Sequence, residues 1–231
     1  MGKQLSLLLL CAAAPLAVVA QEAGTIVPVE EESYHIPMWH NEFVTLLRVE
    51  IAAGRTTGYH LHTRDQLGVV VAPYPGKAYS QLLGKPPNSL RHPPLGDVTF
   101  AGYDTPVTHH IVNPDTTPID QYGVMLNSQK PWGFAPGTRN VPGYTVVMDN
   151  DRARGWRLVL APGETAPAIT QTAPGIRIVV RGGEIAEISP GKPDRSMMLT
   201  QREAFWQQPG ATRAVRNTGS TTIEVVEFEL K

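Results

Sequence analysis

The stretch from Gly54 to Gln66 has the sequence Gly-Arg-Thr-Thr-Gly-Tyr-His-Leu-His-Thr-Arg-Asp-Gln, and it places His60 and His62 two positions apart. Alternate residues of a β-strand point to the same face, so these two side chains project together, about 6–7 Å apart along the backbone. Two imidazoles at that separation can converge on one cation at about 2.0–2.2 Å. A His-x-His pair taken alone is more often surface decoration or a hydrogen-bonded pair. The surrounding sequence therefore decides how the pair is interpreted.

Short runs of β-type residues lie on both sides of this stretch and are separated by Gly, Pro and Asn. Gly and Pro each occur 21 times in 231 residues, which together exceeds the usual combined share of about 12%. No stretch combines sustained helical spacing with capping residues. The pattern predicts an all-β fold of the sandwich or barrel type. The expected strands lie within Phe43–Ile51, Leu67–Ala72, Ile119–Leu126, Trp156–Leu160, Ile176–Val180, Ile185–Ile188 and Ile223–Leu230.

The chain also repeats itself. The segment Leu47–Gly54 parallels Trp156–Gly163, and His109–Asn113 parallels Arg213–Asn217. The offset between the copies is similar in both cases, so the repeat predicts two similar all-β units of about 100 residues, a size typical of a domain. The Trp132–Phe134 segment falls between them and is expected to serve in packing.

With this repeat, the histidine pattern resembles the cupin superfamily. The first cupin motif has the form G-x5-H-x-H-x3,4-E-x6-G, and the second motif ends in H-x3-N. The spacing around His60 and His62 matches the first motif, except that Gln66 stands where the family has Glu and the final Gly has no clean counterpart. His109 and Asn113 match the end of the second motif, whose P-x-G portion is absent.

The resemblance implies two tandem cupin barrels, that is, jelly-roll or double-stranded β-helix domains. It also implies one divalent metal ion, either Fe, Mn, Zn or Ni, held by His60, His62 and His109. Gln66 occupies the position of the fourth ligand, although an amide oxygen is a neutral and weaker donor than a carboxylate. Together with the repeat, the His-x-His pair and the His-x3-Asn block favour metal binding over surface decoration.

The second repeat departs from this pattern. Ile169, Gln171, Gly175 and Arg213 occupy the positions that correspond to the four expected ligands. No metal site can be assembled from these residue types. The second lobe is therefore expected to be degenerate and to serve a structural or dimerisation role. Two interpretations of Arg213 stay open: a solvated side chain, or an anion anchor inside the second barrel.

Other polar residues near the motif are weaker candidates. Asp65 and Tyr103 are candidates for a general acid or base only through their proximity in sequence. His110 alternates to the opposite face from His109 and is not expected to be a ligand. The histidines outside the motif are expected to be structural: His35, His40 and His92.

The N-terminus has the pattern of a signal peptide. Lys3 supplies a positive start, Leu5–Val19 is almost continuously apolar, and Val18 and Ala20 fit the −3 and −1 positions of a cleavage site. An uncleaved anchor is the alternative. The expected product is an exported protein, periplasmic or extracellular. Cleavage would remove Cys11, the only cysteine, so the mature chain could form no disulfide and would have no cysteine nucleophile. The expected organisation is a signal peptide at 1–20, a lead-in at 21–42, a metal-binding lobe at 43–127, a linker at 128–143 and a degenerate lobe at 144–231.

The charge balance and the expected metal site indicate which partners and activities the sequence favours. With 20 basic and 21 acidic residues, the chain has no electrostatic feature typical of a nucleic-acid or membrane-surface partner. We expect a small-molecule substrate or ligand, and a non-haem dioxygenase-like oxidoreductase is the favoured function. The alternatives are a cupin isomerase or lyase and a non-catalytic exported binding protein. Exposed sheet edges favour a homodimer.

Overall fold

The computed structural model describes residues 24–74, 76–89 and 93–231. The predicted signal peptide, Cys11 and His92 lie outside these residues. Strands dominate the described chain, and its only helical segment is a 3₁₀ turn, η1 (Val29–Glu31). The expected all-β fold is confirmed. No helix in the described residues is long and apolar enough to cross a membrane.

Two sheets form the N-terminal half, and each mixes strands that are far apart in sequence. One contains β1 (Val27–Pro28), β5 (His60–His62), β10 (Val107–Asn113), β7 (Tyr79–Leu82) and β8 (Pro87–Ser89) in that order, with β4 (Arg55–Thr56) paired to β10. The other has the order β2 (His35–His40), β3 (Val44–Ile51), β11 (Ile119–Leu126), β6 (Gln66–Ala72) and β9 (Val98–Ala101).

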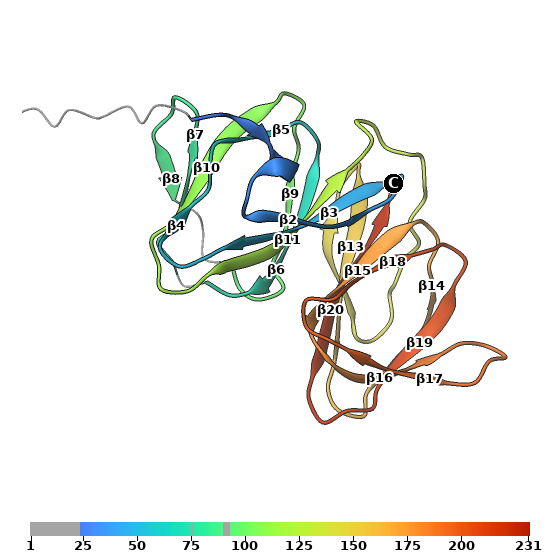
Figure 1. Ribbon diagram of the computed structural model, residues 1–231. Helices are drawn as coiled ribbons and strands as arrows, with labels where there is room; N and C mark the ends of the chain where they lie inside the picture. Colours follow the sequence, from blue (N-terminus) through green and yellow to red (C-terminus); the bar gives the residue numbers. More distant parts are fainter. Residues whose placement is uncertain (1–23, 75, 90–92) are drawn as a thin grey trace, which may run out of the picture.

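Two further sheets form the C-terminal half. One has the order β12 (Tyr144–Asp149), β13 (Ala153–Leu160), β20 (Ile223–Leu230), β15 (Gly175–Arg181) and β18 (Ala204–Gln207). The other has the order β14 (Thr165–Thr170), β19 (Thr212–Asn217), β16 (Gly183–Ile188) and β17 (Arg195–Leu199). The two halves lie side by side, with β3, β6 and β11 of the first near β13, β15 and β20 of the second (Figure 1).

Apolar side chains are buried in three layers, because the four sheets are stacked. The middle layer joins the halves and contains buried side chains from β6 and β11 together with others from β15 and β20. Strand β6 is covered on both faces, in agreement with its nearly continuous apolar run, whereas β20 has three buried glutamates among its apolar residues. The aromatic residues Trp132 and Phe134 pack edge-on against Phe43 in this layer, in agreement with the expected packing role of their segment.

The internal repeat has a counterpart in hydrogen bonds. Asn113 donates its side-chain amide to the carbonyl groups of Ile51 and Thr117, and Asn217 donates in the same way to Leu160 and Thr221. The glycines that close the first repeated segment, at positions 54 and 163, both have a positive φ, of 68° and 82°, which glycine adopts without strain. The repeated residues thus form the same turns in both halves.

Candidate metal centre

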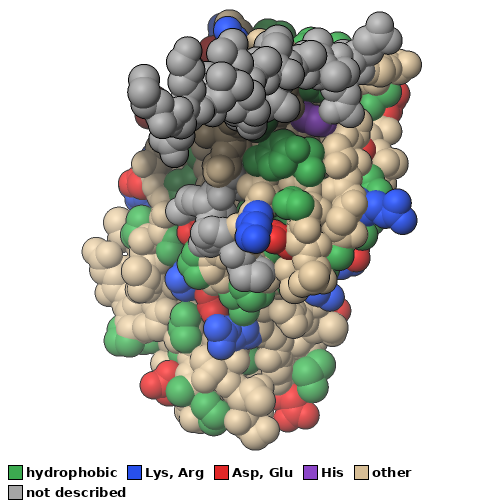
Figure 2. Space-filling view, turned by 90° about the vertical axis from the view of Figure 1, so that its left-hand side faces the viewer, with side chains coloured by type: hydrophobic (Ala, Val, Ile, Leu, Met, Phe, Trp, Pro, Cys, Tyr) green, Lys and Arg blue, Asp and Glu red, His purple; other side chains and the backbone are tan. Residues whose placement is uncertain are grey.

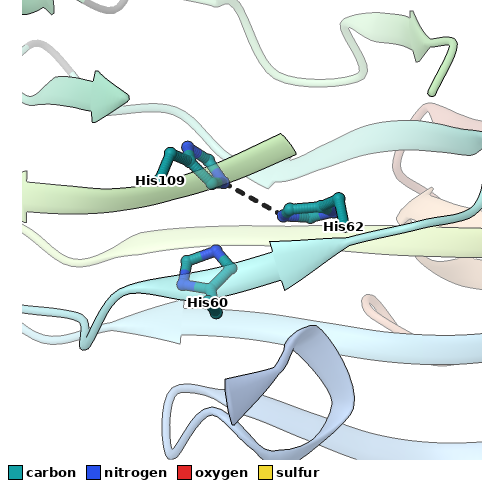
Figure 3. A group of neighbouring side chains, drawn as sticks. All are labelled: His60, His62 and His109. Carbon is teal, nitrogen blue, oxygen red and sulfur yellow. Dashed lines mark hydrogen bonds between the residues drawn. The ribbon is translucent and has the colours of Figure 1, made fainter. Parts of the chain in front are cut away.

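Strands β5 and β10 bring the three expected histidines together. His60 and His62 alternate on β5 and point into the N-terminal half, where they are 0% and 4% exposed. His109 lies directly opposite His60 in the antiparallel β5–β10 pair. The three rings converge from these two neighbouring strands (Figure 3). The three side chains thus lie together inside the N-terminal half, and their role as metal ligands stays a prediction.

The spacing of the ring nitrogens fits a shared cation. The Nε2 atoms of His62 and His109 are 3.0 Å apart, and one ligand-capable nitrogen from each of the three rings lies within 4.8 Å of the other two. Nitrogens bound to one metal ion at about 2.0–2.1 Å in tetrahedral geometry are about 3.3 Å apart. The His62–His109 pair is close to that separation, and the three rings together form a group that could hold a metal ion.

Neighbouring groups orient two of these rings. The Nδ1–H group of His60 donates to the carbonyl oxygen of Gly58 at 2.9 Å, which leaves its Nε2 lone pair free. That Nε2 atom is buried and has no hydrogen-bond partner among the described residues. Ser80 Oγ lies within hydrogen-bond distance of His109 Nδ1, at 2.8 Å, and orients the His109 ring from the side opposite its Nε2 atom. A buried acceptor without a partner, such as His60 Nε2, lowers the stability of the folded protein, and coordination to a cation would satisfy it.

Burial keeps the three imidazoles neutral. Burial, together with the neighbouring imidazoles, lowers the pKa of His60 to about 4, of His62 to about 2 and of His109 to about 3. A metal ion binds the neutral imidazole, so the lone pairs are available at neutral pH without the loss of a proton.

A cavity of about 260 Å³ adjoins the triad. Its lining combines apolar and aromatic side chains with a few polar groups, as is usual for small-molecule sites. None of its lining residues within the described chain is acidic. The lining residues are His35, Val49, His62, Gln66, Val70, Tyr74, Ser80, Pro93, Thr99, Tyr103, His109, Ile111 and Gln121.

Comparisons with known proteins identify the fold. Neither the models of known protein families nor the curated proteins contain a match to this sequence. Among solved structures, AerE from Microcystis aeruginosa aligns with a TM-score of 0.58 at 14% identity, over 84% of this chain and 96% of that one. YhaK from Escherichia coli aligns with a TM-score of 0.57 at 13% identity, over 84% and 87% of the two chains.

A third similar structure is the salicylate 1,2-dioxygenase from Pseudoaminobacter salicylatoxidans, as a mutant in complex with gentisate. It aligns with a TM-score of 0.54 at 11% identity, over 81% of this chain and 69% of that one. These neighbours are cupin-domain proteins. The protein has a cupin fold. At such low identity the likeness extends to the fold alone.

Gln66 lines the cavity beside the histidines. It begins β6, and its Oε1 atom is buried with no hydrogen-bond partner among the described residues. Gly123 on the adjacent strand makes room for it, since a Cβ at that position would lie 2.8 Å from Gln66 Nε2. Coordination by Gln66 stays a prediction.

His35 is a residue of the site that no motif indicates. It was expected to be structural, but it lines the cavity, and its ring centre lies 4.6 Å from that of His60. Its Nδ1 atom is 2.8 Å from the carboxylate of Glu32, and both residues are 4% exposed. Glu32, His35 and His60 form a second group with the spacing of metal ligands. His35 comes from the lead-in strand β2, so only the folded structure brings it here.

The candidates for a general acid or base have different environments. Asp65 forms a buried ion pair with Arg152 in the other half and accepts a hydrogen bond from the backbone N–H of Tyr103 at 2.8 Å, so it is engaged in structure. Tyr103 itself lines the cavity and stacks on His62 with ring centres 4.8 Å apart. His110 turns away, as expected, and stacks on Tyr59.

The corresponding place in the C-terminal half holds no such triad. Ile169 pairs with Arg213 across β14 and β19, just as His60 pairs with His109. Both groups with metal-ligand spacing in the described residues belong to the N-terminal half. Arg213 is only 7% exposed, so the interpretation as a solvated side chain is wrong.

Proposed function

We propose that His60, His62 and His109 bind one divalent metal ion and that the protein acts on a small molecule held in the adjoining cavity. The favoured activity is that of a non-haem dioxygenase-like oxidoreductase. The observation that carries this proposal is the convergence of three neutral imidazoles beside a 260 Å³ cavity: His60 and His62 are buried, His109 is half-buried, and the Nε2 atoms of His62 and His109 are 3.0 Å apart. The bound metal ion would supply Lewis-acid or redox chemistry.

The charge of the site favours an anionic ligand. Three neutral imidazoles leave the charge of a divalent ion uncompensated, and Gln66 replaces the carboxylate of the cupin motif with a neutral amide. The cavity wall within the described residues contributes no acidic group. A carboxylate, phenolate or enolate oxygen of the ligand would therefore be attracted to the end of the cavity beside the metal ion. Tyr74, Tyr103 and Ile111 offer apolar contacts to the rest of the ligand.

Residues around the cavity would position such a ligand. Burial, together with the nearby Asp65 carboxylate, raises the pKa of Tyr103 to about 12, so its phenol stays protonated and can donate a hydrogen bond. The contact between Glu32 and His35 Nδ1 sets the orientation of the His35 ring at the cavity wall. These contacts orient a ligand and exclude water from one side of it.

The neighbouring salicylate 1,2-dioxygenase, whose structure contains gentisate, supports the choice of an oxidoreductase over the isomerase and lyase alternatives. The replacement of the motif glutamate by Gln66 supports the other alternative, a binding protein without turnover. Acidic and basic side chains are interspersed on the face shown in Figure 2, which gives no support to a polyanionic partner on that face. Export through the N-terminal segment is part of the proposal.

Elemental analysis of the protein purified from its native compartment tests the metal site. We expect about one metal ion per chain and none in the His60→Ala/His62→Ala double variant. Iron would support oxygen chemistry, to be followed by oxygen-consumption assays with small aromatic acids. Zinc or manganese would support the isomerase or lyase alternative. An equal metal content in the native protein and the double variant would overturn the proposed centre.

A further inference from the structure

The C-terminal half has a cavity of its own, of about 330 Å³. Its lining residues come from β15, β16, β17, β18 and β19 and from the loops beside them, strands that Figure 1 labels in the C-terminal half. Arg213, which stands at the position of His109 in the repeat, is part of its wall. The cavity is lined by Arg177, Glu187, Ser189, Arg195, Met197, Phe205, Trp206, Gln207, Gln208, Ala211 and Arg213.

Two buried guanidinium groups of this wall have unused hydrogen-bond donors. Arg177 is 4% exposed and donates from Nε to Glu227 at 2.6 Å and from Nη1 to Glu187 at 2.9 Å, but its Nη2 has no partner among the described residues. Arg213 donates from Nη2 to Glu227 at 3.3 Å, and its Nε makes no hydrogen bond. Buried donors of this kind are normally satisfied, so they indicate a missing acceptor.

The buried ion-pair network beside the cavity is electrically neutral without a ligand. Three arginines and three glutamates form one ion-pair network, in which Arg139 links Glu227 and Glu229. Arg195 adds a further positive charge at the cavity wall. It is exposed and forms no ion pair within the part of the chain that the structure describes. The cavity with its network therefore carries one uncompensated positive charge, which matches a monoanion.

The other walls are suited to an apolar body. Phe205 and Met197 are half-buried and line the cavity, while Gln207 offers a buried Oε1 acceptor that has no partner among the described residues. A volume of 330 Å³ lies at the small end of ligand sites, which suits one ring or a short chain. We infer that this second cavity binds a small organic monocarboxylate with an apolar body, separately from the proposed metal centre.

Calorimetric titration of the full chain with benzoate tests this inference, with benzamide as the neutral probe of the same shape. The titration is run with a chelator present, so that no metal ion attracts a carboxylate to the first cavity. We then expect one benzoate per chain and at least about tenfold weaker binding of benzamide. The same benzoate binding is expected in the His60→Ala/His62→Ala variant, because the second cavity does not use those residues. Loss of benzoate binding in that variant would place the ligand at the first cavity and overturn the inference.

Substitutions at the rim of the second cavity provide a second test of the inference. Arg195→Gln removes an exposed charge and should weaken benzoate binding about tenfold. Ala211→Leu, also at an exposed position, should narrow the entrance and weaken it at least as much. The matched control is Arg55→Gln, an exposed arginine of the other half without an ion pair in the described residues, and it should bind as the unmodified chain does. Absence of saturable benzoate binding, or equal affinities in Arg195→Gln and Arg55→Gln, would also overturn the inference.

Discussion

The Nε2 atoms of His62 and His109 lie 3.0 Å apart, and burial keeps both imidazoles neutral. A direct hydrogen bond between two neutral imidazoles uses one proton and one lone pair, whereas a shared cation uses a lone pair of each ring. The third ring, His60, directs no proton to this pair, since its Nδ1–H group is engaged with Gly58. Three lone pairs around one point favour the cation.

Removal of the metal ion should therefore destabilise the protein. A ligand present at about 100 times its dissociation constant stabilises the folded state by about 2.7 kcal/mol. For a chain of this length that corresponds to a Tm that is lower by about 5–10 °C after chelation. Differential scanning calorimetry before and after chelator treatment measures the change, and restoring the metal should reverse it. In His62→Gln the chelator should have no effect; an equal decrease there would contradict a site at the triad.

The stability of the metal-free protein should decrease as the pH falls below about 6.5. The three histidines have folded-state pKa values of about 4, 2 and 3, well below the ordinary value of about 6.5. Below about pH 6.5 the unfolded chain takes up protons that the folded chain excludes. The free energy of unfolding is therefore retained above that pH and lost as the pH falls toward 4, by up to about 1.4 kcal/mol per pH unit for each histidine.

Urea unfolding in the presence of a chelator, at a series of pH values, measures this slope. The His60→Gln/His62→Gln variant provides the comparison, because it removes two of the three groups while the rest of the chain keeps its titration. We expect a clearly flatter dependence in the variant. Parallel curves would show that these imidazoles are not kept neutral by the fold.

The sequence was sufficient to predict the triad but not its surroundings. Two histidines that alternate on one strand must share a face, and the cupin resemblance added His109 through its His-x3-Asn motif. The approach of His109 to the pair depends on the pairing of β5 with β10, which the structure shows. His35 lies on another strand, and nothing local in the sequence indicates that the lead-in folds back onto the cavity. Glu227 is a similar case, since its partner Arg139 comes from the segment between the two halves.

The Glu32 carboxylate should matter for stability but not for metal content. Burial alone raises its pKa, but the contacts with His35 and the backbone N–H groups of Tyr34 and Gly58 outweigh burial and lower it. Glu32→Gln removes the charge that these groups require and should reduce the free energy of unfolding by about 1–3 kcal/mol. The exposed neighbour Glu31→Gln is the control. A variant that folds but loses its metal would instead assign the ion to the group of Glu32, His35 and His60.

Restoring the carboxylate of the cupin motif should strengthen metal binding. Gln66 reaches the cavity with an unpaired buried oxygen, so Gln66→Glu places a negative charge close to the triad without a change of shape. We expect the metal affinity to rise at least about tenfold, as measured by competition with a chromophoric chelator. Gln121→Glu adds the same charge to another part of the cavity wall and should have a smaller effect. Equal effects would mean that Gln66 is not directed at the ion.

The stability of the C-terminal half should depend on the buried carboxylate of Glu227. Burial alone raises the pKa of this carboxyl, but Arg177, Arg139 and Arg213 outweigh burial and hold its pKa well below the ordinary value. Glu227→Gln leaves these buried guanidinium groups with too little negative charge, and breaking a buried ion pair costs about 3–5 kcal/mol. Chemical denaturation should show a loss of that size, whereas the exposed Glu184→Gln should change the free energy of unfolding little. A small effect of Glu227→Gln would mean that the arginines are satisfied by other groups, and the charge balance assigned to the second cavity would then be wrong.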